Sequence, residues 1–191
     1  RIQATPPLEA LRAATMLTTQ STAASSESQA KQATKEQSDF EALKRRIDEL
    51  AKEQGIAKHV RTSIDPQGLT IELLTDKVFF DSGQAWLKAP AVTLLGKVGK
   101  VIAGERVHPV LVEGHTDAQP IHTARYSSNW SLSGDRAAAV VDVLNRNGVF
   151  ARRLSLKGYG AEDPVATNST PEGRSRNRRV DVVLTRLHPT P

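Results

Sequence analysis

The sequence reads His-Thr-Asp at residues 115–117, Asn-Trp-Ser-Leu-Ser-Gly-Asp-Arg-Ala at residues 129–137 and Asn-Arg-Arg-Val at residues 177–180. The first segment places a carboxylate at the exit of an apolar run. The second carries an arginine near the start of a helix, and the third places arginines just before a last strand. An acid and a guanidinium held close together suit a zwitterion, a ligand with an ammonium and a carboxylate on one carbon.

Patterns typical of strands and helices alternate around these segments. Val60–Ile64 and Leu69–Leu74 predict two strands joined by a reverse turn, because Asp-Pro-Gln-Gly lies between them. Helices are expected over Pro90–Ile102, where apolar residues recur with a helical period, and over Asn129–Asn145. Further strands are expected at 110–112, 154–158 and 180–184, with a polar loop over 163–176. This alternation predicts an α+β fold, an α/β sandwich in which helices cover one face of a single sheet.

The first third of the chain differs in composition from the rest. Residues 18–38 hold Ser, Thr, Gln, Ala and charged residues without a large apolar side chain. Such a segment buries too little surface to offset its ordering entropy, so we expect a flexible linker or a fraying helix there. Before it, residues 8–17 form a short, weakly amphipathic helix candidate that follows two prolines. Residues 1–38 are therefore expected to form an N-terminal segment apart from the folded domain.

A second helix candidate precedes the domain. Residues 39–57 are expected to form a linker helix, and the domain itself is expected to span residues 58–187. The helix carries a narrow apolar stripe, formed by Phe40, Leu43, Ile47 and Leu50. Such a stripe suits either docking on the domain or contact with a second copy of the chain, and its length does not separate the two.

Composition excludes several classes of protein. Hydrophobic residues make up 38% of the chain and aromatic residues 4%, so the core must be aliphatic. The absence of cysteine excludes a disulfide framework and thiolate metal sites. A net charge of +5 is typical of a solvated surface and not of a nucleic-acid footprint. The sequence contains neither a membrane-spanning apolar run nor a signal-peptide pattern, and because it begins at Arg1 and not at Met we expect a longer parent protein.

The acid and the arginine are expected to meet at one end of the sheet. Asp117 follows a strand, and ligands collect at strand ends in sheets covered by helices. If a helix starts near Asn129, then Asn129, Ser133 and Arg136 lie along one stripe beside its apolar face. Arg136 would then be partly desolvated at the rim of the core, where it binds a carboxylate strongly. An internal ion pair between Asp117 and Arg136 explains the pattern equally well on spacing alone.

Other chemistries fit the sequence poorly. A hydrolase triad of His115, Asp117 and a serine lacks the Gly-x-Ser-x-Gly turn. A metal site of His115, His122 and Asp117 lacks helical or hairpin spacing. A nucleic-acid site at the arginines near the C-terminus lacks an aromatic platform; these are Arg174, Arg176, Arg178 and Arg179. We therefore expect a binding module without catalysis, metal or cofactor.

The motifs resemble those of the OmpA-like peptidoglycan-binding domain over roughly Val60–Leu184. That resemblance implies a βαβαβ-type domain with a mixed sheet. It also implies that the Thr-Asp pair and the arginine grip the diaminopimelate, or an equivalent diamino acid, of the peptidoglycan stem peptide. Carried over by motif, the implied site residues are Thr116, Asp117, Asn129, Leu132, Ser133, Arg136, Asn177 and Arg178. One departure is Asp135, a carboxylate beside Arg136 where small residues are commoner, which would compete with a ligand.

Within this family the chain is similar to the MotB-type flagellar stator subunits. The similarity lies in the long loop 118–128, in 80–83, in 170–174 and in the helix upstream of the first strand. It implies a periplasmic anchor of a proton-driven stator, a homodimer, and a MotA-type partner reached through an inner-membrane helix upstream. By position, residues 8–17 would match the plug segment of such proteins. The alternative is a passive wall anchor of the outer membrane, of the OmpA or Pal type.

Overall fold

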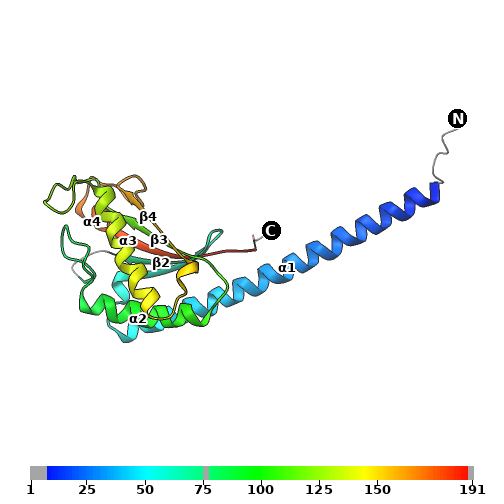
Figure 1. Ribbon diagram of the computed structural model, residues 1–191, viewed down its shortest axis with the longest axis horizontal. Coiled ribbons are helices and arrows are strands. Elements are labelled where there is room, and N and C mark those ends of the chain that lie inside the picture. The colour runs from blue at the N-terminus through cyan, green and yellow to red at the C-terminus, as the bar shows by residue number, and fades with distance from the viewer. Residues whose placement is uncertain (1–7, 75–77, 189–191) are drawn as a thin grey trace. The chain divides into compact units, whose positions relative to one another are not determined.

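The computed structural model describes residues 8–74 and 78–188 and contains a five-stranded mixed sheet (Figure 1). The strands are β1 (Val60–Asp65), β2 (Gly68–Leu74), β3 (Val110–His115), β4 (Leu154–Gly160) and β5 (Arg179–Thr185). They lie in the order β1-β2-β5-β3-β4. The pair β3 and β4 is parallel, and the other neighbours are antiparallel. The predicted α+β fold with a mixed sheet is confirmed.

Two helices cover one face of this sheet, as predicted. They are α2 (Ala89–Gly104) and α3 (Asn129–Arg146), and the 3₁₀ turns η1 (Ala57–His59) and η2 (Ala151–Arg153) precede β1 and β4. Strand residues that face the helices are fully or almost fully buried; they include Leu69, Ile71, Leu73, Val110, Val112, Val180, Val182 and Leu184. Because side chains alternate along a strand, the residues between them lie on the other face. That face carries several charged groups, among them Glu113 and Asp181.

The helix α1 (Leu8–Glu53) is continuous where the sequence predicts a linker or fraying helix at 18–38. Its 46 residues contain neither glycine nor proline, and the polar stretch is rich in Ala, Gln, Lys and Glu, which favour helix. The prediction rested on the absence of large apolar side chains and underrated the local helix propensity, and Ala33 and Glu36 of this segment are each only 4% exposed. None of the helices in the described residues has the apolar length that crossing a bilayer requires. The first seven residues, and the side chains up to residue 26, lie outside what the structure describes, so the plug assignment stays a prediction.

The chain divides into two compact units, one of which is Asp39–Leu187. The second half of α1 belongs to this unit. Its side chains Phe40 and Ile47 are fully buried, Leu50 is 4% exposed, and Leu43 packs against the same hydrophobic core. The apolar stripe therefore docks on its own domain, which is one of the two uses expected for it. The predicted start of the domain at residue 58 remains to be tested by truncation.

The polar loop predicted at 163–176 contains a short helix, α4 (Pro171–Asn177). Thr170 caps it by accepting a hydrogen bond from the Gly173 backbone N–H at 3.1 Å, and Pro171 occupies the first turn, where its missing N–H costs nothing. The helix has no apolar periodicity, so the periodicity that revealed α2 and α3 could not reveal it. Its position matters because Asn177 ends it and Arg178 follows directly.

Candidate functional site

Two glycines let α3 lie directly on β3 and β4. A Cβ atom at Gly114 would stand 2.0 Å from the backbone oxygen of Ser133, and one at Gly158 would stand 2.6 Å from the backbone nitrogen of Gly134. Such distances are far below van der Waals contact, so only glycine fits at these positions. The close approach brings the first turns of α3 beside the end of β3, where the Thr-Asp motif lies.

Asp117 is held at the end of β3 by charge and by backbone contacts. Its Oδ2 accepts a hydrogen bond from Arg178 Nη1 at 2.6 Å, and its Oδ1 accepts one from the Gln119 backbone N–H at 3.1 Å. Its carbonyl oxygen accepts from Thr116 Oγ1 at 2.9 Å and from Asn129 Nδ2 at 3.3 Å. Asp117 is buried, whereas the Arg178 side chain is 35% exposed. The pair thus joins a fixed acid to an arginine that reaches the surface.

Arg136 is anchored through its Nε atom, whereas its two terminal amino groups remain available to a ligand. Its Nε donates to the Gln84 carbonyl oxygen at 2.9 Å, and its guanidinium lies 5.2 Å from the centre of the Phe80 ring. Burial, with a contribution from the nearby charge of Arg178, lowers the pKa of Arg136 to about 10, although Tyr126 and Asp117 oppose the shift. Within the described residues, its terminal amino groups form no hydrogen bond. A desolvated guanidinium with free amino groups is suited to a carboxylate.

The sequence left open an ion pair between Asp117 and Arg136, and the structure does not contain it within the described residues. Asp117 pairs with Arg178, and in the described part of the chain it makes no ion pair with Arg136. The two residues are nevertheless close enough to interact electrostatically. Asp135 does not compete for Arg136 either, because it is exposed and its carboxylate lies 4.0 Å from Arg125 Nη2. The expected competitor is therefore engaged elsewhere.

Several of the motif residues have structural roles here. Ser133 is fully buried, donates to the Trp130 carbonyl at 3.0 Å and accepts from the Gly160 N–H at 3.0 Å, so it ties α3 to the end of β4. Leu132 packs in a small cluster with Ala85 and Tyr126. These two residues shape the site but have no free polar atom to offer a ligand.

Asn177 is likewise fully buried and fully used. Its Oδ1 accepts from the backbone N–H groups of Val165 and Ala166, both at 2.9 Å, and its Nδ2 donates to the Ala166 carbonyl and to Asn168 Oδ1, also at 2.9 Å. It therefore fixes the loop ahead of α4. Asn168 was not singled out from the sequence, yet its Oδ1 also accepts from the Ala118 N–H at 3.1 Å. This asparagine links α4 to the residue after Asp117.

Phe80 and Gln84 were also missed as site residues. Phe80 was noted only within the segment 80–83, and Gln84 acts through its backbone carbonyl, which no side-chain pattern can reveal. An isolated bridge between Phe80 and Leu87 closes the loop that presents both groups to Arg136. The signal that the sequence offered for Phe80 was an aromatic residue placed just before residues that favour a turn.

His115 belongs to a different environment from Asp117. It is 1% exposed, stacks on Tyr159 with ring centres 5.0 Å apart, and has Asp163 and Asp181 as its acidic neighbours at 3.7 and 3.6 Å. Burial, with the charge of Arg179, lowers the pKa of His115 to about 4, so the ring is neutral at neutral pH. This arrangement does not assemble the hydrolase triad, and His122 lies in the exposed loop with Nδ1 3.0 Å from the Ser127 carbonyl.

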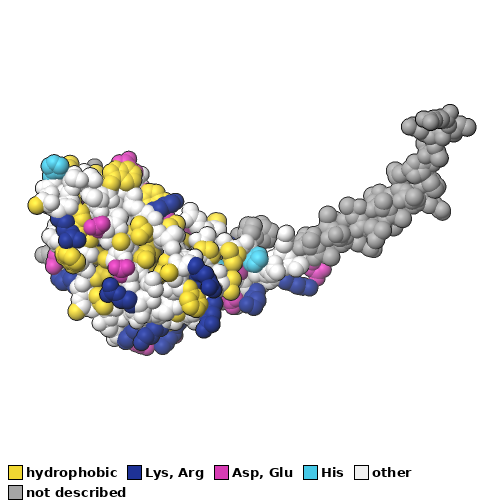
Figure 2. All heavy atoms as spheres, in the orientation of Figure 1, with side chains coloured by type: hydrophobic (Ala, Val, Ile, Leu, Met, Phe, Trp, Pro, Cys, Tyr) yellow, Lys and Arg dark blue, Asp and Glu magenta, His cyan; other side chains and the backbone are white. Residues whose placement is uncertain are grey.

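The arginines near the C-terminus are mostly engaged within the domain. Arg174 donates to the Asn168 carbonyl, Arg178 to Asp117, and Arg179 to Asp181 and Asp163. On the visible face, basic side chains lie scattered among acidic and hydrophobic ones (Figure 2). These contacts favour the ligand-facing and sheet-end roles of the arginines over a nucleic-acid footprint.

A cavity of about 530 Å³ opens beside Asn129. Its walls come from both ends of the loop between β3 and α3 and from the loop after β4. They are Ala118, Pro120, Ile121, His122, Ser127, Ser128, Asn129, Trp130, Ala161 and Glu162. Trp130 is 55% exposed here. The cavity therefore adjoins the loop of Asp117 and offers an apolar platform next to it.

Comparisons with known proteins find relatives among motility proteins and cell-wall anchors. Motility protein B of Bacillus subtilis is 35% identical over 78% of this chain and 57% of its own length. The chain thus spans less than two thirds of that relative. The periplasmic domain of Helicobacter pylori MotB has a TM-score of 0.60 and 28% identity, covering 66% of this chain and 81% of that one. The cell wall anchor of the T6SS from Pseudomonas aeruginosa has a TM-score of 0.65 and 33% identity, covering 73% and 97%.

The model of the OmpA family matches residues 79–178, more than half of the chain. The match starts beside Phe80 and ends at Arg178, so it contains Asp117, Arg136 and the loops that hold them. The chain belongs to the OmpA family.

Proposed function

We propose that this domain binds peptidoglycan by gripping the diamino acid of the stem peptide, without catalysis. The observation that carries the proposal is the buried Arg136, whose Nε donates to Gln84 while its amino groups make no hydrogen bond within the described residues. The charge of Asp117 acts on Arg136 from nearby. Arg136 would bind the carboxylate of the headgroup, and Asp117 its ammonium. Arg178 holds the Asp117 carboxylate in position until the ligand arrives.

The cavity beside Asn129 would receive the rest of the stem peptide. Its apolar walls at Pro120, Ile121 and Trp130 suit a small apolar side chain next to the diamino acid. Asn129 lines this cavity, and its Nδ2 donates to the Asp117 carbonyl at 3.3 Å and to the Gln119 carbonyl at 3.0 Å. Asn129 therefore lies between the cavity and the acid. The site would thus read a charged headgroup and a small apolar neighbour together.

In the cell, the domain would serve as the wall anchor of a MotB-type stator subunit. The Bacillus and Helicobacter relatives support this role, and the latter supports a periplasmic location. The stator role carries with it a homodimer, an inner-membrane helix in the parent protein and a MotA-type partner. A stator must resist the torque of the rotor, so it needs firm contact with a fixed mesh.

A passive wall anchor is the second candidate, and the likeness to the T6SS anchor favours it. Both roles use the same binding chemistry, so the site does not separate them. Cross-linking of the full-length protein in cells does. Recovery with a MotA-type subunit in the inner membrane supports the stator role, whereas recovery with the outer membrane supports the passive anchor.

Co-sedimentation with purified peptidoglycan tests the binding site. Arg136→Lys keeps the charge but loses the planar fork, and Asp117→Asn removes the acid while keeping its shape. We expect each variant to lose at least tenfold in affinity, since truncating one member of a desolvated charge contact costs about 2–5 kcal/mol.

Arg146→Lys is the matched control, because Arg146 lies on the same helix with its side chain 77% exposed. Its binding should equal that of the unmodified chain. Undiminished sedimentation of Arg136→Lys and Asp117→Asn, with folding verified by circular dichroism, would show that the pocket is wrongly assigned.

A further inference from the structure

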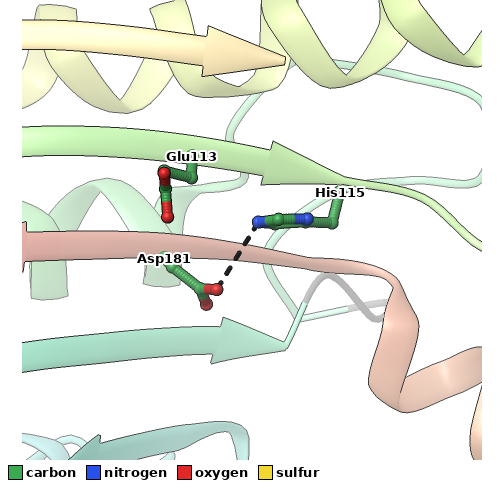
Figure 3. A group of neighbouring side chains, drawn as sticks. All are labelled: Glu113, His115 and Asp181. Carbon is green, nitrogen blue, oxygen red and sulfur yellow. Dashed lines mark ion pairs between the residues drawn. The ribbon is translucent and has the colours of Figure 1, made fainter. Parts of the chain in front are cut away.

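The open face of the sheet brings two carboxylates and a histidine together. Glu113 and His115 stand two residues apart on β3 and so share one face, and the register places Asp181 of β5 directly opposite Glu113. One potential ligand atom from each of the three lies within 4.8 Å of those from the other two. Figure 3 shows the Glu113 carboxylate directed towards β5 and the Asp181 carboxylate directed towards the His115 ring.

The buried atoms of this group are not satisfied by the protein. His115 is 1% exposed, and neither of its ring nitrogens makes a hydrogen bond within the described residues. The same holds for Asp181 Oδ1, in a residue that is 8% exposed. Buried polar atoms are nearly always hydrogen-bonded, so atoms of this kind that converge on one point indicate a missing partner. Two carboxylates directly opposite each other also destabilise a strand pair unless a cation lies between them.

The neighbouring groups leave room for a cation. Arg179 Nε donates to Asp181 Oδ2, the oxygen 3.6 Å from His115 Nε2, at 2.9 Å, and within the described residues Asp181 Oδ1 accepts no hydrogen bond. Tyr159 donates its hydroxyl to Glu113 through one oxygen, Oε1, at 3.1 Å. Arg179 and Tyr159 therefore orient the two carboxylates, as groups around metal ligands commonly do. Arg179 and Lys157 are the nearby positive charges, and Asp163 offsets the first of them at 3.3 Å.

A route from solvent exists. A concavity of about 890 Å³ lies over this face of the sheet, and Glu113, Tyr159, Asp163 and Asp181 are among its lining residues. His115 lies beneath the stacked ring of Tyr159 and would approach the ion from the inner side. A β-bulge between Gly114 and His115 in the pairing with β4 gives the backbone at His115 a local kink of the kind that redirects side chains.

We propose that Glu113, His115 and Asp181 form a binding site for a divalent transition metal ion, with zinc the best match. An imidazole with two carboxylates suits zinc or cobalt better than calcium or magnesium, which prefer oxygen ligands alone. Tetrahedral zinc with bonds of about 2.1 Å holds two ligand atoms about 3.4 Å apart, so the ligand atoms, which lie within 4.8 Å of one another, must close by up to about 1.4 Å. The ion would bridge β3 and β5 and neutralise their opposed carboxylates.

The test is titration of the whole chain, dialysed against chelator, with Co²⁺ and Zn²⁺. Calorimetry gives the stoichiometry, and visible absorption of Co²⁺ reports a site with nitrogen and oxygen ligands. We expect one ion per chain and a melting temperature raised by about 5 °C at saturating Zn²⁺. His115→Gln and Glu113→Gln should each weaken binding at least tenfold and abolish the visible band.

His122→Gln is the matched control, because it removes an exposed histidine outside the group. Its Co²⁺ spectrum and affinity should equal those of the unmodified chain. If His115→Gln fails to fold, Glu113→Gln decides alone, since Glu113 is only partly buried. The proposal is overturned by the absence of stoichiometric binding, or by binding that Glu113→Gln leaves unchanged or that His122→Gln removes.

Discussion

Arg136 shows how a single residue can be anchored and still serve a ligand. Its Nε donates to the Gln84 carbonyl and its guanidinium lies near the Phe80 ring, while its amino groups make no hydrogen bond in the part of the chain that the structure describes. Lysine cannot replace it, because its three N–H donors radiate from one nitrogen and cannot bind the carbonyl while also presenting a planar pair of donors to a carboxylate. The choice of arginine at this position therefore follows from the geometry of the guanidinium.

Arg153 provides a contrasting case, since its guanidinium is entirely used inside the fold. It donates to the backbone of Ile102 and His108 at 3.1 and 2.8 Å and to Glu105 Oε2 at 2.8 Å. Burial alone would raise the pKa of Glu105, but hydrogen bonds from His108 and Val107 and the charges of His108 and Arg153 outweigh it, so the pKa is lowered. This clamp joins the end of α2 to the start of β4.

A pH dependence of stability follows from that clamp. A carboxyl whose pKa is lowered on folding stabilises the fold fully above its ordinary value of 4.5, and this contribution is lost as the pH falls through the folded-state pKa. We expect Glu105→Gln to reduce the free energy of unfolding at pH 7 by about 3 kcal/mol, because Arg153 stays buried without its counter-ion. Urea unfolding at several pH values measures both effects.

The loss of stability below pH 4.5 should be shallower in Glu105→Gln than in the unmodified chain. Glu49→Gln is the control, because Glu49 pairs with Arg46 at 3.3 Å with its side chain 59% exposed, and it should change little. Identical acid profiles for Glu105→Gln and the unmodified chain would refute the role of the clamp.

Individual residues were predictable from the sequence to different degrees. The motif places Asp117 and Arg136 near each other, and the structure does so. The sequence did not reveal that Asp117 pairs with Arg178 or that Asn177 bonds only to the backbone and side chains around it. Neither contact follows from local spacing in the sequence. Both depend on how the loop before α4 folds, which rests on the hydrogen bonds of Asn168.

At the level of elements, the packing of α3 on the sheet depends on glycine. Gly114→Ala would bring a methyl group into the Ser133 backbone, which cannot move without shifting the helix. We expect a loss of about 3 kcal/mol in the free energy of unfolding, and weaker wall binding because Arg136 would move with α3. Thermal or urea unfolding checks the first effect, and co-sedimentation checks the second.

Gly134→Ala is the internal control for this packing. A Cβ at Gly134 meets nothing within 4 Å, so alanine there should be neutral or stabilise α3 by roughly 0.5–1 kcal/mol. Equal stabilities for Gly114→Ala and Gly134→Ala would contradict the contact between α3 and β3.

The elements with strong periodicity were predictable, and those without it were not. Helix α2 and the buried strands carry apolar patterns that local sequence displays. Helix α4 has only seven residues, and a capping threonine and a proline are its signals in the sequence. The polar part of α1 has helix propensity but no apolar periodicity. The group of Glu113, His115 and Asp181 was invisible for another reason: only the register of β3 against β5 brings Asp181 opposite Glu113.

For the whole molecule, the extent of the independent folding unit is the open question. Phe40, Ile47 and Leu50 supply core contacts to Asp39–Leu187, and each large side chain buried contributes about 2 kcal/mol. A chain starting at Asp39 should therefore keep the stability of the full sequence. A chain starting at Lys58 should lose more than about 5 kcal/mol, which is comparable to the whole stability of many domains.

Urea unfolding of the two truncated chains, followed by circular dichroism, measures this difference. Equal stability of both would mean that the second half of α1 is a linker helix that contributes nothing to the core. That outcome would restore residues 58–187 as the domain, as the sequence alone suggests.

The central claim is that Asp117 and Arg136 together hold the ammonium and the carboxylate of one diamino acid headgroup. Calorimetric titration with two synthetic stem peptides tests it most directly. One peptide carries diaminopimelate, and the other carries lysine at that position, which keeps the ammonium and lacks the side-chain carboxylate. The account predicts that the lysine peptide binds at least tenfold more weakly, and that Arg136→Lys abolishes the difference. Equal affinity of the unmodified chain for both peptides would contradict it.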